Sequence, residues 1–142
     1  MFTLLSMIFC HIVDDYYLQW KLASFKQKSW WQENAPDEMY KHDYIVALMM
    51  HSFSWAFMVM LPIAVSQSFD IGAGFAAMFV VNTSVHAIVD DLKANKRKIN
   101  LVTDQSIHIS QIIVTFLICM LSWEQGDSDY DWNFGKEYWK VI

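Results

Sequence analysis

YIVALMMHSFSWAFMVMLPIAVS, residues 44–66, is an apolar run in which His51 is the only side chain that ionises near neutral pH. An α-helix rises about 1.5 Å per residue, so this run would extend about 34 Å as a helix. The hydrocarbon core of a bilayer is about 30 Å thick. The run therefore predicts a transmembrane helix, and the rest of the chain is interpreted around it.

Two later segments have the same apolar character. Residues 71–90 contain no polar side chain before Asn82, and residues 105–123 are interrupted only by uncharged polar groups and His108. A membrane span needs about 20 predominantly apolar residues, and both segments meet that length. We therefore predict a second and a third transmembrane helix here.

Residues 1–20 make a weaker additional span. The apolar run ends before Asp14 and Asp15, and each exposed aspartate opposes insertion by roughly 2.5–3.5 kcal/mol. A basic beginning and a small-residue cleavage site are both missing, so we expect a retained helix and not a cleaved signal peptide. The predicted fold class is all-α, an integral membrane bundle of four transmembrane helices in residues 1–123, followed by an acidic, aromatic tail in residues 124–142.

Charged residues gather in two loops and in the tail. The loops, residues 21–43 and 91–104, lie on one side of a four-span bundle, and each contains four basic residues. Because positive loops stay in the cytoplasm, we expect this side of the bacterial inner membrane to be cytoplasmic and both termini to be outside. The net charge is −5 and no long basic face is present, so no nucleic-acid-binding surface is expected. The expected partners are membrane lipids, and a homo-oligomer is left open.

Histidine and aspartate recur near the cytoplasmic ends of all four predicted spans. Ionisable groups inside apolar spans are expensive to keep there and commonly mark a metal site or a proton path. In three spans a histidine and an aspartate stand four residues apart, which places both on one helical face where they can grip one ion. The candidate metal ligands are His11, Asp15, His51, His86, Asp90, Asp104 and His108.

A metal ion would explain why a membrane tolerates these groups. A cation neutralises aspartates that lipid would penalise, and imidazole and carboxylate ligands suit zinc, manganese or iron. We predict a divalent metal cofactor, with zinc as the first choice, in one or two ions. A metal-free network of buried polar groups is the alternative. Cys10 and Cys119 lie far apart inside apolar runs and are interpreted as packing residues.

Neighbours of these residues are candidates for supporting roles. Gln19 and Gln105 could orient metal ligands through hydrogen bonds, and Lys93 could face an anionic substrate or extend to the membrane interface. Asp14 adjoins Asp15, but consecutive residues point about 100° apart on an α-helix. We therefore favour Asp15 as the ligand.

The signature residues resemble those of a bacterial and phage membrane protein family of unknown function. Its pattern is HxxxDxxLQ, an isolated histidine, HxxxDxxK and DQxxH, and all four parts occur in order within about residues 1–110. That family is in turn similar to membrane-bound metal-dependent hydrolases and, more remotely, to all-helical zinc phospholipase C and nuclease enzymes. The resemblance implies the same seven residues as the site and supplies no settled reaction.

The predicted site indicates a reaction class. A metal held by histidine and carboxylate can lower the pKa of bound water and polarise a phosphoryl oxygen when one coordination position is open. We therefore expect a membrane-embedded metal-dependent hydrolase acting on a phosphoester or lipid phosphate at the cytoplasmic interface. Asp15, Asp90 and Asp104 are the candidate catalytic residues, as ligands and as a general base.

Two other functions fit the same residues. A transporter or channel would use them to pass protons or a divalent cation. A structural or partner-binding membrane protein would use a closed metal site to join its four helices.

Overall fold

The computed structural model describes residues 2–126, and within them the chain is helical, with no strand. This confirms the all-α class. The predicted tail, residues 124–142, lies outside the described residues from residue 127 onward. The elements in chain order are α1 (Phe2–Val13), the π-helix η1 (Asp14–Leu18), α2 (Leu22–Phe25), α3 (Lys28–Asn34), the 3₁₀-helix η2 (Glu38–Tyr40), α4 (Asp43–Ser66), α5 (Ala73–Ala94) and α6 (Leu101–Gly126).

Three segments are long and apolar enough to cross a membrane, which indicates a membrane protein. The predicted fourth span in residues 1–20 is not confirmed, because α1 contains 12 residues. A helix of that length extends only about 18 Å before Asp14 and Asp15 begin the π-helix. The three segments are Glu38–Ser66, Ala73–Ala94 and Leu101–Leu121.

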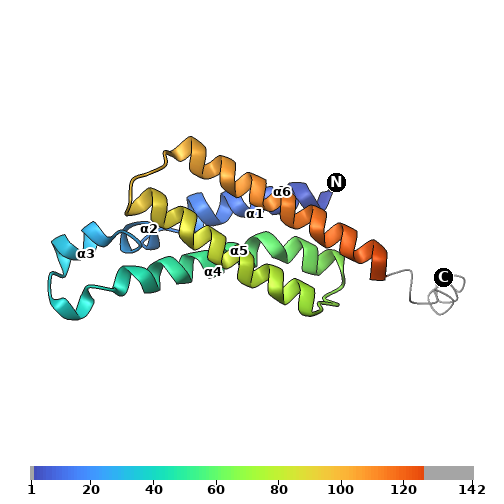
Figure 1. Ribbon diagram of the computed structural model, residues 1–142, viewed down its shortest axis with the longest axis horizontal. Helices are drawn as coiled ribbons and strands as arrows, with labels where there is room; N and C mark the ends of the chain where they lie inside the picture. Colours follow the sequence, from blue (N-terminus) through green and yellow to red (C-terminus); the bar gives the residue numbers. More distant parts are fainter. Residues whose placement is uncertain (1, 127–142) are drawn as a thin grey trace, which may run out of the picture.

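The long helices lie along the long axis of the molecule, and α1 packs against α4 and α6 (Figure 1). Side chains from these three helices form an apolar core, against which Phe75 and Phe79 of α5 also pack. The interpretation of Cys119 as a packing residue is confirmed. The buried core residues are Met7, Trp55, Ala56, Val59, Ile63, Ile112 and Cys119.

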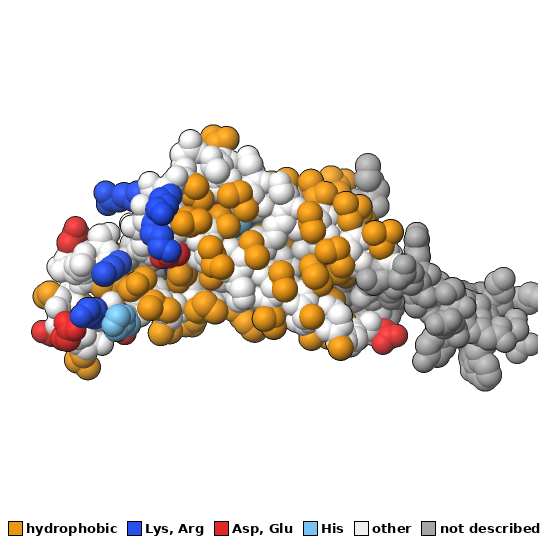
Figure 2. Space-filling model, viewed as in Figure 1, with side chains coloured by type: hydrophobic (Ala, Val, Ile, Leu, Met, Phe, Trp, Pro, Cys, Tyr) orange, Lys and Arg blue, Asp and Glu red, His pale blue; other side chains and the backbone are white. Residues whose placement is uncertain are grey.

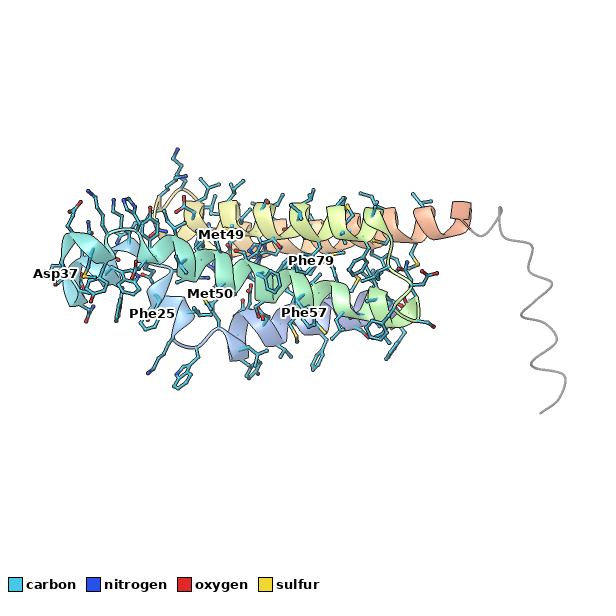
Figure 3. All side chains as sticks on the ribbon, turned by 90° about the horizontal axis from the view of Figure 1, so that it is seen from below. Phe25, Asp37, Met49, Met50, Phe57 and Phe79 are labelled. Carbon is cyan, nitrogen blue, oxygen red and sulfur yellow. The ribbon has the colours of Figure 1, made fainter. Side chains whose placement is uncertain are left out.

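Large apolar side chains remain exposed around the outside of the helices, as Figure 2 shows for one face. Met50 and Phe57 are 60% and 52% exposed, and Figure 3 shows both along α4. Soluble monomers rarely expose contiguous apolar surface of this extent. The surface therefore suits contact with lipid.

Both basic loops lie at one end of the molecule, where α2 and α3 meet the connection from α5 to α6 (Figures 1 and 2). Asn95 joins them. The backbone N–H of Lys28 donates to Asn95 Oδ1 at 2.8 Å, and Asn95 Nδ2 donates to the carbonyl of Lys26 at 3.1 Å. The two loops therefore share one end of the molecule, as expected.

Candidate metal centre

The seven predicted ligands meet in one buried group beside the basic end, here called the ligand cluster. Six of them are at most 3% exposed, and the side chain of the seventh, Asp15, is 8% exposed. Their helices are far apart in sequence, so packing of the bundle creates the cluster. The residues are His11 of α1, Asp15 of η1, His51 of α4, His86 and Asp90 of α5, and Asp104 and His108 of α6.

Two aspartates approach the same pair of histidines, and we call these four residues the four-ligand cage: Asp15, His51, His86 and Asp90. His51 Nε2 lies 3.4 Å from Asp15 Oδ1 and 3.4 Å from Asp90 Oδ2. His86 Nε2 lies 3.2 Å from His51 Nε2, 4.0 Å from Asp15 Oδ1 and 3.7 Å from Asp90 Oδ2. Asp15, His51 and His86 therefore offer ligand atoms that could hold one ion, and Asp90 adjoins them at both histidines.

These separations fit a small divalent cation. Zinc binds nitrogen and carboxylate oxygen at about 2.0–2.1 Å, so the ligand atoms of a tetrahedral site lie about 3.3–3.4 Å apart. The five distances above run from 3.2 to 4.0 Å. Four of the five lie within about 0.4 Å of the tetrahedral value, so these pairs of atoms are spaced as ligands of one ion would be.

A second group of potential ligands adjoins the cage. His86, Asp90 and His108 also offer ligand atoms close enough to hold one ion. His108 Nε2 lies 3.6 Å from Asp90 Oδ1 and 3.4 Å from Asp104 Oδ1. Because Asp90 turns Oδ2 to the cage and Oδ1 to His108, its carboxylate could bridge two ions.

Several polar atoms of the cluster are buried without a hydrogen-bond partner among the described residues. They include Asp15 Oδ1, Asp104 Oδ1 and His108 Nε2. Buried polar atoms in proteins are nearly always hydrogen-bonded, and buried charge is costly unless it is compensated. A cation would satisfy these atoms, so the donor set fits a divalent metal.

The π-helix brings both neighbouring aspartates to the bundle interior. The Gln19 N–H donates to the Asp14 carbonyl at 3.0 Å, five residues back, and such widened turns are frequent at functional sites. Ser54 Oγ donates to Asp14 Oδ1 at 2.6 Å, and Asp14 Oδ2 lies 3.6 Å from His51 Nδ1. Asp14 therefore faces the ring nitrogen of His51 that points away from the cage, where a carboxylate orients a metal-binding imidazole.

His11 is held by protein groups at both ring nitrogens. Trp55 Nε1 donates to His11 Nδ1 at 2.8 Å, and His11 Nε2 lies at hydrogen-bond distance, 3.1 Å, from Gln105 Oε1. His11 is not part of either ion-sized group found among the described residues. The structure thus places it beside the cage, 3.5 Å from Asp15 Oδ2.

The predicted supporting residues all contact the cluster. Gln19 Nε2 donates to His51 Nε2 at 2.7 Å, and Gln105 Nε2 donates to Asp104 Oδ2 at 3.0 Å. Lys93 was expected to face a substrate or extend to the interface. Its Nζ donates to Asp104 Oδ2 at 2.6 Å, and its side chain is 34% exposed.

Lys26 is a member of the site that the sequence analysis missed. It is only 8% exposed, and its Nζ donates to Asp90 Oδ2 at 2.5 Å. In the sequence it is one of several lysines in a charged loop, and it is not part of any four-residue spacing like those that identified the histidines and aspartates. Its position depends on the fold of residues 19–27 over the end of the bundle, which helical periodicity does not reveal.

Comparison with known proteins assigns the chain to a family. The sequence model described as "Protein of unknown function (DUF3307)" matches residues 3–132, so the chain belongs to this family. No curated protein and no solved structure matched it. The function must therefore be argued from the site.

Proposed function

We propose that the protein is a membrane-embedded, metal-dependent hydrolase that cleaves a phosphoester or a lipid phosphate. The four-ligand cage carries the proposal, because Asp15, His51 and His86 offer ligand atoms close enough together to hold one divalent cation, and Asp90 Oδ2 lies 3.4 and 3.7 Å from the two histidines. The adjoining group that shares Asp90 offers a second position. Paired metal positions are a common arrangement in phosphoesterases.

The cage residues would hold the first ion, and Asp90, Asp104 and His108 would hold a second. Zinc is our first choice, with manganese and iron as the other metals that suit nitrogen and carboxylate ligands. When bound, such a metal supplies a water of lowered pKa and polarises a phosphoryl oxygen. The chain itself contributes the orientation of these groups, through Asp14 on His51 and Gln105 on Asp104.

Asp104 is the residue that we assign as proton acceptor when it does not bind a second ion. Lys93 and Gln105 hold its Oδ2, whereas its Oδ1 is buried without a hydrogen-bond partner among the described residues. A general base needs an oxygen within reach of the proton that it takes. As the oxygen of water bonds to phosphorus and the ester P–O bond breaks, Asp104 would take the water proton and then pass it to the leaving ester oxygen, which departs as an alcohol.

The proposed substrate reaches the site from the cytoplasm. The basic loops lie at the end of the molecule next to the cluster, and positive loops stay on the cytoplasmic side of the bacterial inner membrane. Helix α1 begins away from this end (Figure 1), in keeping with termini outside. The exposed apolar side chains would then face membrane lipids.

A proton or divalent-cation transporter is the alternative, because buried polar groups continue from the cluster along α5 and α6. Asn82 Nδ2 donates to Thr115 Oγ1 at 3.0 Å, and Gln111 Nε2 donates to Asn82 Oδ1 at 2.8 Å. These side chains mainly satisfy one another, as polar residues do between membrane helices. That pattern favours a one-sided site over a conduction path.

Metal content is the first test. Mass spectrometry of detergent-purified protein would compare the wild type with His86→Ala/Asp90→Ala, and with His42→Ala as the control, since His42 is exposed. We expect near-stoichiometric zinc, manganese or iron in the wild type and the control, and none in the double variant. Absence of metal from all three proteins, with the double variant folded, would contradict the proposal.

Activity separates the enzyme from its rivals. Cleavage of bis-p-nitrophenyl phosphate or of phosphatidic acid in vesicles is expected for the metal-loaded wild type, and its loss is expected in Asp104→Asn. Ion flux into proteoliposomes without cleavage would favour the transporter. Bound metal with neither activity would favour a metal that only joins the helices.

A further inference from the structure

A cationic pocket opens beside the ligand cluster at the basic end. It has an empty volume of about 770 Å³, and Asp90 of the four-ligand cage lies in its wall. A molecule in this pocket would therefore lie next to the cage. The residues that matter for its chemistry are Gln19, Lys26, Gln27, Asp90, Lys93 and Arg97.

The charge of this pocket distinguishes it from another at the same end. Its lining contains three cationic side chains, Lys26, Lys93 and Arg97, and one carboxylate. The neighbouring pocket has two lysines and two acids in its lining, so its charges balance. Converging lysine and arginine groups are the typical receptor for phosphate, because each charge-assisted hydrogen bond is strong and arginine can donate two in parallel.

Two of the cations are bound to aspartates of the ligand cluster. Lys26 Nζ donates to Asp90 Oδ2, the same oxygen that faces His51 Nε2 and His86 Nε2 at 3.4 and 3.7 Å. Lys93 Nζ donates to Asp104 Oδ2. An aspartate oxygen that ligates a metal ion is a weaker partner for an ammonium group, so with an ion on Asp90 Oδ2 the Lys26 ammonium would be available to an anion.

Arg97 stands at a position whose backbone favours glycine. Its φ is 52°, in the left-handed region, directly after α5 ends. The Lys98 N–H, next along the chain, donates to the Leu92 carbonyl of α5 at 2.9 Å. An arginine here is strained, so the side chain and not the backbone accounts for its presence.

We propose that Lys26, Lys93 and Arg97 bind the phosphate group of the substrate, and that a metal ion in the cage strengthens this binding by engaging Asp90, the aspartate that otherwise holds Lys26. The inference rests on the proposed hydrolase and names its anion subsite. The phosphate could belong to a soluble ester or to a lipid headgroup, since both present the same anionic oxygens.

Phosphate binding to the detergent-purified protein tests the inference. Inorganic phosphate is titrated by calorimetry into zinc-loaded and zinc-free wild type, with bound zinc measured in the same samples. We expect binding to the loaded protein and binding weaker by about tenfold or more in Lys26→Gln and Arg97→Gln, the loss of one charge-assisted bond. Lys28→Gln is the matched control, because Lys28 is an exposed lysine of the same end and lines the charge-balanced pocket.

Arg97→Gly separates binding from folding. Glycine suits the left-handed backbone, so this variant is expected to unfold at the same or a higher temperature while it loses phosphate affinity. Unchanged phosphate affinity in the Lys26 and Arg97 variants with zinc still bound would overturn the inference and leave the hydrolase proposal standing. Failure of the wild type to bind zinc, manganese or iron would overturn both.

The source of the phosphate is decided by competition. Glycerol 3-phosphate and nanodiscs containing phosphatidic acid are compared as competitors of inorganic phosphate, with phosphatidylcholine nanodiscs as the blank. Stronger competition by either phosphate compound supports the subsite and identifies a soluble or a lipid substrate. Competition by neither would count against it.

Discussion

The apolar core and the ligand cluster are built on the same helices and meet at Trp55, one turn from His51 on α4. The Trp55 ring belongs to the core, stacks on His86 at 4.3 Å between ring centroids, and donates its N–H to His11. On the core side of Trp55 the side chains are apolar, and packing contacts alone satisfy them. On the cluster side, buried oxygen and nitrogen atoms lack hydrogen-bond partners among the described residues, and the groups that carry them could hold a metal ion.

Among the substitutions that would test this difference between core and cluster, Asp90→Ala is expected to have the largest effect on stability and on metal binding. It removes the carboxylate that lies beside His51, His86 and His108 and leaves Lys26 buried without its partner, which costs about 3–5 kcal/mol of stability. Metal should be lost as well. Unfolding in detergent and metal analysis measure the two effects. Asp91→Ala, which removes a more exposed acid paired with Lys96, is the control and should cost about 1 kcal/mol or less.

Ile112→Ala should damage the core and spare the cluster. Ile112 is fully buried, and the cavity left by the truncation costs about 2–4 kcal/mol. Metal stoichiometry should stay that of the wild type while the variant is folded. Ile113→Ala removes a side chain that is 40% exposed and should cost less than about 1 kcal/mol. Loss of metal in folded Ile112→Ala would show that the two regions are not separable.

Asp14→Asn should weaken metal binding without removing it. The side-chain oxygen of asparagine can still accept from Ser54, but the negative charge beside His51 Nδ1 is lost. Groups in this position change metal affinity by about 10–100-fold. Competition with a chelating dye measures the change, and Ser54→Ala should act in the same direction by loosening Asp14. An unchanged affinity in both variants would remove Asp14 from the site.

His11→Gln should have the smallest effect on metal. Both ring nitrogens of His11 are engaged by Trp55 and Gln105, so we expect metal affinity to change by less than about tenfold. Loss of the Trp55 hydrogen bond should cost about 1 kcal/mol of stability. Metal affinity reduced as far as in Asp90→Ala would instead make His11 a ligand, as its spacing from Asp15 suggests.

Three of the four predicted spans could be read directly from the sequence because membrane helices have a local signature. Residues 44–66, 71–90 and 105–123 each correspond to a long helix in the structure. The first segment was less predictable, since its apolar run is short and ends in two acids. Its helix gives way there to a π-turn, which no simple periodicity anticipates.

The sequence by itself determined which side chains could share a face, because a spacing of four residues sets their angle around a helix. It therefore identified three pairs of side chains: His11 with Asp15, His86 with Asp90, and Asp104 with His108. Only the tertiary structure decided that Asp14 faces His51, that Trp55 and Gln105 hold His11, and that Lys26 reaches Asp90. These contacts join residues distant in sequence, so they depend on how the helices pack and on how the loop after η1 folds back.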